Sequence, residues 1–326
     1  MSCFRNILVG IDLSHCARLA PDALGPIVSE VFDRSVWLAR RTSGRLTFFS
    51  ALNLTEELLL MLEEKHRVVV IRKIEEEASQ VLAALVQKAS EAGVTATASF
   101  VRGTGWLEII EQVLRDEHDL VLVGTRDGSG SHHRPFGNTA KKLLRRCPCP
   151  VWMCRPEPYD RPLNMLVASD LSPVSETALH LAVRLGNATK AVIHLLHAVD
   201  YPVYHLWLTA LPDQVGRDYH RRVLEHAEQV LHDQVEKTEY RSLAEPIRIH
   251  LADKVGKPDE VILKCIREYA IDVLVMGTIG RGGVTGIMIG NTAERLVPEV
   301  TCSILAVKPP GFRCPVRPPS SGLPGR

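Results

Sequence analysis

The sequence lacks the features that mark membrane and secreted proteins. No apolar run approaches the ~18 residues that a membrane-spanning helix needs. The N-terminal stretch MSCFRNILVGIDLS has neither the basic region nor the small-residue cleavage site of a signal peptide. The eight cysteines follow no regular spacing, which favours reduced thiols in a cytoplasm over a disulfide framework. We therefore expect a cytoplasmic protein.

The sequence also has little net charge and no recognisable set of catalytic residues. The formal net charge is +1, so we expect no general attraction to nucleic acid or to membranes. No set of residues offers a nucleophile with a base and an orienting group, and no Walker-type lysine motif is present. The sequence therefore predicts a protein that is not an enzyme, with slow ATP hydrolysis left open.

What the sequence does contain is an internal repeat. Residues 102–156 align without a gap onto residues 255–309, and the segment from Asp119 to Thr125 (DLVLVGT) falls on the segment from Asp272 to Thr278 (DVLVMGT). The stretch NILVGIDLS, which begins at Asn6, likewise matches NMLVASDLS, which begins at Asn164. A period of about 150 residues is far too long for a solenoid, so the repeat indicates two copies of one domain.

The repeat sets the expected domain boundaries. The first copy covers residues 1–156 and the second covers residues 162–310, with prolines at positions 156, 158 and 162 marking a linker. Residues 311–326 form a Pro-rich tail, which we expect to be extended or disordered unless Phe312 docks on the body.

Apolar strands alternate with helices in each copy. In the second copy, strands are expected at Met165–Ser169 and Ala191–Val199, and a long helix at Gln214–Tyr240. In the first copy, Glu56–Ala92 is typical of a long helix interrupted by the β-branched run Val68–Ile71. The alternation predicts an α/β fold of two tandem, doubly wound, Rossmann-like parallel sheets. In such sheets, ligands bind outside the carboxyl ends of the strands, where the strand order reverses.

One glycine-rich stretch, from Asp272 to Lys308, indicates where a ligand would bind. An apolar strand ends at Gly277, Gly280 and Gly290 follow at fixed spacing, and a helix opens at Asn291 and Thr292. Asparagine is a favoured N-cap, and the free N–H groups of a helix terminus attract phosphate. The alternative is a tight turn before a helix that binds nothing.

This stretch resembles the phosphate-binding segment of the universal stress protein family. The family pattern is glycine, two residues, glycine, nine residues, glycine, then Ser or Thr, and Asn291 stands where the hydroxyl residue is usual. Gly-Asn-Thr occurs in both copies, and the chain is similar to the tandem, two-domain type of this family over nearly its whole length. The resemblance implies an adenine nucleotide alpha hydrolase-like fold and ATP, with Mg²⁺, as the ligand. The nucleotide-binding residues that it implies are Ala168, Ser169, Asp170, Ala198, Gly277, Gly280, Arg281, Gly290, Asn291 and Thr292.

Several of these positions allow a second interpretation. Asp170 is either an acid near the base and ribose or a cap of the turn before Ser175. Arg281 either neutralises phosphate or is a surface cation. In the first copy, Asp127 replaces the second glycine and Pro135 removes a backbone donor, so we expect that loop to have lost family-type nucleotide binding.

A metal site is not expected. Cys147, Cys149 and Cys154 with His132 and His133 offer zinc ligands, but Cys-x-Cys is not the usual spacing of structural zinc sites. Cysteines that flank an apolar strand commonly behave as small buried hydrophobes. The sequence therefore predicts no metal.

Two functions from different classes remain open. The first is a ligand-binding stress protein whose second copy holds an adenine nucleotide. The second is a scaffold whose sites have degenerated and whose clefts serve a protein partner or an apolar ligand. In either case, the apolar strands Val151–Cys154 and Ser303–Val307 are expected to pair as an intramolecular pseudo-dimer, because exposed apolar edges invite aggregation. Further homo-oligomers are left open.

Overall fold

The computed structural model describes residues 3–13, 25–54, 60, 64–124, 136–155, 161–199, 213–237, 240, 243–253, 257–278 and 290–317. The chain forms two compact units. The first comprises Met1–Pro156 together with Phe312–Arg326, and the second comprises Glu157–Gly311.

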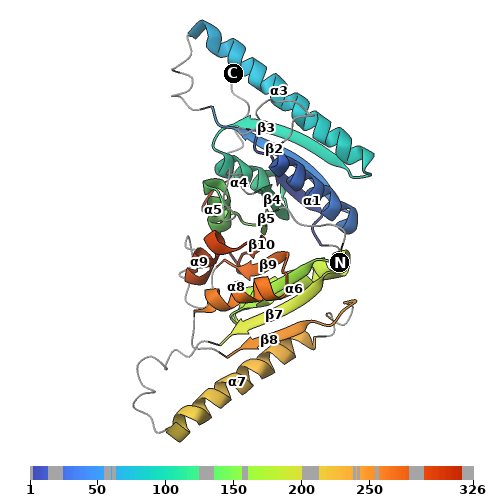
Figure 1. The fold of residues 1–326 in the computed structure, drawn as a ribbon. Coiled ribbons are helices and arrows are strands. Elements are labelled where there is room, and N and C mark those ends of the chain that lie inside the picture. Colours follow the sequence, from blue (N-terminus) through green and yellow to red (C-terminus); the bar gives the residue numbers. More distant parts are fainter. Residues whose placement is uncertain are drawn as a thin grey trace. The chain divides into compact units, whose positions relative to one another are not determined.

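The first unit is a parallel sheet with connecting helices (Figure 1). Its elements are β1 (Asn6–Gly10), α1 (Pro26–Thr42), β2 (Arg45–Leu52), α3 (Glu64–Glu91), β3 (Ala96–Arg102), α4 (Gly105–Asp116), β4 (Leu120–Gly124), α5 (Asn138–Arg146) and β5 (Val151–Cys154). The strands lie in the order β3-β2-β1-β4-β5, and every neighbouring pair is parallel.

The second unit repeats this arrangement. Its elements are β6 (Asn164–Ser169), α6 (Pro173–Thr189), β7 (Val192–Ala198), α7 (Asp213–Val235), β8 (Arg248–Ala252), α8 (Pro258–Glu268), β9 (Val273–Gly277), α9 (Asn291–Glu299) and β10 (Ser303–Val307). The strands lie in the order β10-β9-β6-β7-β8, again all parallel. The predicted α/β class, with two tandem doubly wound sheets, is confirmed.

The last two strands of the second unit are almost fully buried. All five residues of β10 are buried, as are the first four of β9, so these strands are continuous apolar runs rather than alternating patterns. The strand order reverses where β6 lies between β9 and β7. In doubly wound sheets, ligands bind outside the carboxyl ends of the strands at such a reversal.

Two predictions about helices are wrong, one about an interruption and one about a helix end. Helix α3 runs unbroken through Val68–Ile71, where the sequence predicts an interruption. Val68 and Val69 are exposed and Val70 and Ile71 half-buried, so the helix continues mainly because β-branched residues lower helix propensity only slightly. Helix α7 ends at Val235 rather than at Tyr240.

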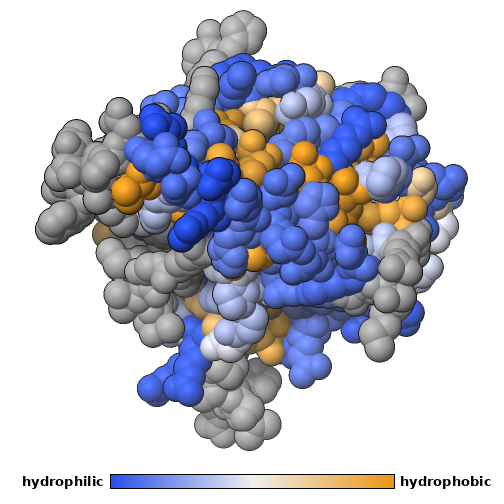
Figure 2. Space-filling model, turned by 90° about the horizontal axis from the view of Figure 1, so that it is seen from below, coloured by the Kyte–Doolittle hydropathy of each residue, from blue (hydrophilic) through white to orange (hydrophobic). Residues whose placement is uncertain are grey.

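The surface agrees with the ordinary composition. Figure 2 shows a face that is mainly hydrophilic, with apolar side chains scattered among charged ones, as on most folded proteins. Among the described residues, no helix is both long and apolar enough to cross a membrane.

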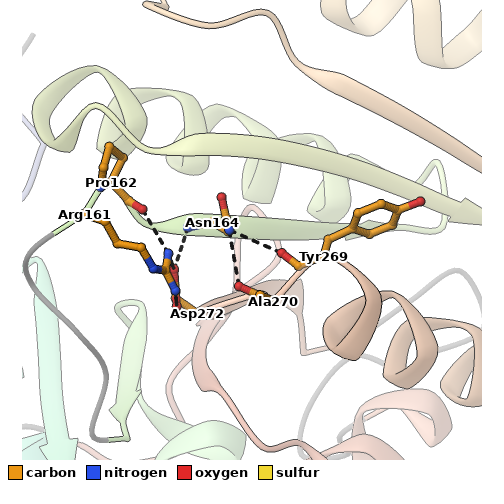
Figure 3. Close-up of polar contacts among 6 residues, drawn as sticks. All are labelled: Arg161, Pro162, Asn164, Tyr269, Ala270 and Asp272. Atoms are coloured by element: carbon orange, nitrogen blue, oxygen red, sulfur yellow. Dashed lines mark hydrogen bonds and ion pairs between the residues drawn. The ribbon is translucent and has the colours of Figure 1, made fainter.

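A buried carboxylate ties the strands of the second unit together at their amino ends (Figure 3). Asp272 accepts hydrogen bonds from the backbone N–H of Asn164 at 2.7 Å and from both terminal nitrogens of Arg161, at 2.7 and 2.6 Å. The Asn164 amide in turn donates to the carbonyls of Tyr269 and Ala270, both at 3.3 Å. These contacts fix the start of β6 against β9.

The first unit repeats the clamp. Asp119 accepts from the N–H groups of Arg5 at 2.6 Å and Asn6 at 3.0 Å, and the Asn6 amide donates to the Asp116 carbonyl at 2.7 Å. The Asn and Asp residues that match between the two copies therefore have a structural role at the amino ends of the strands.

The described part of the tail belongs to the first unit. The Cys314 thiol donates to the carbonyl of Arg146 at 3.3 Å. Residues 312–317 thus lie against this unit, as in the docking alternative for the tail. The expected pairing of the two last strands stays a prediction.

Candidate functional site

The carboxyl ends of three neighbouring strands form the frame of the site. In the parallel register, Ala168 of β6 lies beside both Leu196 of β7 and Met276 of β9. Ala198 and Gly277 end those two neighbours. The structure therefore brings Ala168, Ser169, Ala198 and Gly277 to one edge, as the parallel sheet predicts.

The start of α9 is joined to the same edge. The Gly290 N–H donates to the carbonyl of Thr278 at 2.8 Å, and the Thr278 N–H donates to Val307 at 3.0 Å. Thr278 directly follows β9, so this bond holds the first turn of α9 close to the end of that strand. The positions of Gly280 and Arg281 lie outside the described residues.

The predicted cap of this helix is wrong in one respect. The helix opens at Asn291, as expected, but the N-cap is Gly290, with φ −59° and ψ 147° and no side-chain cap hydrogen bond. The first intrahelical bond runs from the Glu294 N–H to the Gly290 carbonyl at 2.9 Å. Within the described part of the chain, the N–H groups of Asn291, Thr292 and Ala293 have no acceptor, so three donors stand open at this terminus.

Asp170 stabilises the turn between β6 and α6. Its Oδ1 accepts the Ser172 N–H at 3.1 Å and also the Ser172 hydroxyl. Ser172 is the N-cap of α6, and its hydroxyl accepts the N–H of Ser175 at 3.4 Å. The Asp170 carboxylate thus orders the turn between β6 and α6, which is the structural alternative stated for it above.

Gly277 is required by packing. A Cβ at this position would lie 2.9 Å from Cγ1 of Val174, below the shortest distance that side chains tolerate. Val174 is in the first turn of α6, so the glycine lets this helix approach β9 closely. The sequence pattern assigned Gly277 to the binding of a ligand. In the structure, the group that lies close to Gly277 is the side chain of Val174.

His197 directly precedes Ala198, a predicted contact, but was not itself among the predicted site residues. Its Nδ1 lies 2.8 Å from the Ser169 carbonyl, and the side chain is buried. The carbonyl accepts, so Nδ1 carries the proton. The Ser169 hydroxyl bonds to the Ser175 hydroxyl at 3.1 Å and accepts from the Leu171 N–H at 3.1 Å. The only sequence signal was a histidine at the end of an apolar strand.

A second cluster was also missed, on β7 and the neighbouring edge strand β8. His194 of β7 and His250 of β8 form an N···N contact of 2.9 Å, and the ring of Tyr269 lies 5.0 and 4.5 Å from their ring centres. Burial lowers the pKa of His194 to about 4, with further lowering by His250 and Arg248. No short sequence spacing joins these residues, because the parallel sheet brings them together.

The cysteines of the first unit form a thiol pair. The sulfur atoms of Cys147 and Cys149 are 3.6 Å apart and both side chains are buried. The hydrogen bond to Cys147, together with burial, raises the pKa of Cys149 well above its usual value. His132 and His133 lie outside the described residues, and the described residues contain no group of three or more metal-ligand side chains.

Comparison with known proteins agrees with both the repeat and the fold. The profile of the Universal stress protein family matches residues 4–155 and 163–308. Universal stress protein E of Photorhabdus laumondii is 28% identical over 97% of this chain and 99% of its own length, and that of Escherichia coli K12 is 26% identical over 97% and 98%. A crystal structure of a universal stress protein from Archaeoglobus fulgidus has a TM-score of 0.63, at 21% identity, over 93% of this chain and 97% of its own. The chain belongs to the universal stress protein family.

Proposed function

We propose that this protein is a cytoplasmic stress protein whose second unit binds an adenine nucleotide, ATP with Mg²⁺ in the first instance, without fast turnover. The observation that carries the proposal is the first turn of α9. Three N–H groups without acceptors in the described chain stand at a helix terminus that is tied to the end of β9. Such donors, added to the helix dipole, favour a phosphate group.

The neighbouring strand ends supply the rest of the pocket. Ala168 and Ala198 offer backbone groups with small side chains, so a planar base can approach the main chain there. The proposed phosphate contacts come from Gly290, Asn291 and Thr292, with Gly280 and Arg281 from the glycine-rich segment. Gly277 contributes indirectly, by letting α6 pack against β9.

We expect slow ATP hydrolysis because of the hydrogen bonds that polar side chains at the strand ends already make. A hydrolase needs a base within hydrogen-bond reach of its nucleophile or of a bound water. The Asp170 carboxylate, the acid at these strand ends, already accepts hydrogen bonds from Ser172 and so is less able to activate a bound water. We therefore expect ATP turnover far below the typical enzyme rate of about 10 per second.

The cytoplasmic assignment rests on the thiols. None of the seven cysteines in the described part of the chain is in a disulfide, which fits a reducing compartment.

Calorimetry with ATP and Mg²⁺ on the full chain tests the proposal, using Gly290→Val and the matched variant Gly137→Val in the first unit. Both glycines have extended backbone angles that valine adopts without strain, with φ −59° at Gly290 and φ −62° at Gly137. We expect one ATP per chain, lost in Gly290→Val because the side chain fills the phosphate position and retained in Gly137→Val. Equal binding by the wild type and Gly290→Val, or loss only in Gly137→Val, would contradict the proposal.

A further inference from the structure

The two copies differ most in charge at one equivalent helix. Helix α5 of the first unit reads NTAKKLLRR and contains four cations and no carboxylate. Its counterpart α9 reads NTAERLVPE and contains one cation and two carboxylates. At matched positions, Lys141 stands against Glu294 and Arg146 against Glu299, so the charge is reversed at two sites of one scaffold.

The contact between this helix and the preceding helix, α4 in the first unit and α8 in the second, also differs in charge. In the second unit, Arg295 Nε donates to Asp259 Oδ1 at 2.9 Å, and the ion pair neutralises both charges. In the first unit Trp106 stands where Asp259 does, and the cations of Lys142 and Arg146 lie 5.1 and 4.7 Å from its ring centre. An aromatic ring holds a cation in place without cancelling its charge.

The positive charges of Lys141, Lys142 and Arg146 are therefore not neutralised by a carboxylate of the described residues. In the described chain, Lys141, Lys142 and Arg146 have no carboxylate within ion-pair distance. Lys142 and Arg145 are exposed, and the other two cations are half-exposed. Residues four apart on a helix are neighbours, so the four cations form two adjacent rows within about one turn.

We propose that this surface, formed by Lys141, Lys142, Arg145 and Arg146 over Trp106, binds an acidic segment of a partner protein. Within each row the two cations are about one helical turn apart, so they can pair with a short run of carboxylates. The positive charge would steer an acidic segment to this surface and orient it there. The surface is an interaction site that the second unit does not duplicate.

Other polyanions fit this surface less well. Double-stranded nucleic acid is typically bound through about 6–10 phosphate contacts, more than four cations supply. Single strands need open aromatic faces for base stacking, whereas Lys142 and Arg146 lie over Trp106. A membrane-surface helix needs an apolar face to insert, but the apolar residues of α5 (Ala140, Leu143 and Leu144) are buried in the unit.

Fluorescence anisotropy with a fluorescein-labelled decaglutamate peptide and the full-length protein tests the proposal. In 50 mM NaCl we expect saturable binding, and we expect Lys141→Glu/Arg146→Glu to weaken it at least tenfold. These substitutions copy α9 of the second unit, where the same scaffold carries both carboxylates. Raising NaCl to 300 mM should also weaken binding, because exposed charges are screened.

The matched control is Arg72→Glu/Lys73→Glu on α3, which changes the net charge equally at exposed cations of the same unit. It should leave the affinity within twofold. Should the α5 double variant lose its circular dichroism signal, Lys142→Gln replaces it, with an expected loss of about threefold. Equal effects of the α5 and α3 variants, or tighter binding of decauridylate or of phosphatidylserine vesicles than of the peptide, would overturn the proposal.

Discussion

The Nδ1 atom of His194 lies 2.9 Å from the Nε2 atom of His250, with 6° between the ring planes and 5.1 Å between the ring centres. So short an N···N contact at that centre distance means that the imidazoles meet edge to edge. One ring nitrogen donates and the other accepts, so a single proton lies between them. If both rings were protonated, two N–H groups would face each other and the bond would be lost.

This relationship predicts an acid-sensitive second unit. Burial is the main cause that lowers both pKa values; Arg248 lowers them further, and Glu268 opposes the shift at His250. A histidine whose folded pKa is depressed stabilises the protein above its unfolded pKa of 6.5 and loses that contribution as pH falls toward the folded value, about 4 for His194. We expect the free energy of unfolding to fall by about 1 to 2 kcal/mol between pH 7 and pH 5 from His194.

Urea unfolding at the two pH values measures the effect. The control is His194→Thr, because the sheet register places Thr47 at the matching position of the first unit. This variant should lose most of the pH dependence. A wild type and a variant with the same loss between pH 7 and pH 5 would rule out the histidine pair as the cause.

A second prediction concerns the buried clamp in Figure 3. The side chain of Asp272 is 6% exposed, and Asp272→Ala removes the acceptor of the Asn164 N–H and of the Arg161 guanidinium, which is itself 39% exposed. We expect a loss of about 1.5–3 kcal/mol, typical of hydrogen bonds to a charged group. Asp259→Ala removes the acceptor of the Arg295 Nε hydrogen bond and should cost less than about 1 kcal/mol. Chemical denaturation compares the two, and equal losses would disprove the assignment.

A third prediction separates packing from ligand binding at Gly277. Gly277→Ala places a Cβ 2.9 Å from Val174 and should destabilise the second unit by about 1–3 kcal/mol through overpacking. Val174→Ala in the same chain removes the clashing methyl groups. A double-mutant cycle should then show a favourable coupling of about 1 kcal/mol or more. Additive effects would show that the glycine is needed for another reason.

A fourth prediction distinguishes the two interpretations of Asp170. Asp170→Ala removes the acceptor of the Ser172 N–H and should cost about 1 kcal/mol, as the loss of a cap does. Asp170→Asn keeps an acceptor oxygen and should stay within about 0.5 kcal/mol of the wild type. ATP calorimetry on the Asn variant supplies the second readout: unchanged affinity supports the turn role, whereas a loss without destabilisation supports contact with the nucleotide.

Some of this protein could be derived from local patterns alone. The repeat around Gly277 and Gly290, the alternation of apolar strands with helices and the start of α9 at Asn291 were all readable, because short-range periodicity and glycine spacing encode them. The interruption predicted at Val68–Ile71 failed because four β-branched residues cost a helix little when good helix formers continue it on both sides.

The sequence by itself determined the family, the fold class and the order of strands and helices, since these follow from local pattern and from the repeat. Only the tertiary structure decided which role each polar group plays. It committed Asp170 to a turn, matched Gly277 to Val174, and joined His194 to His250 across two strands. The physical reason is that such roles depend on neighbours distant along the chain, and a parallel sheet brings those neighbours together through crossovers that no local spacing records.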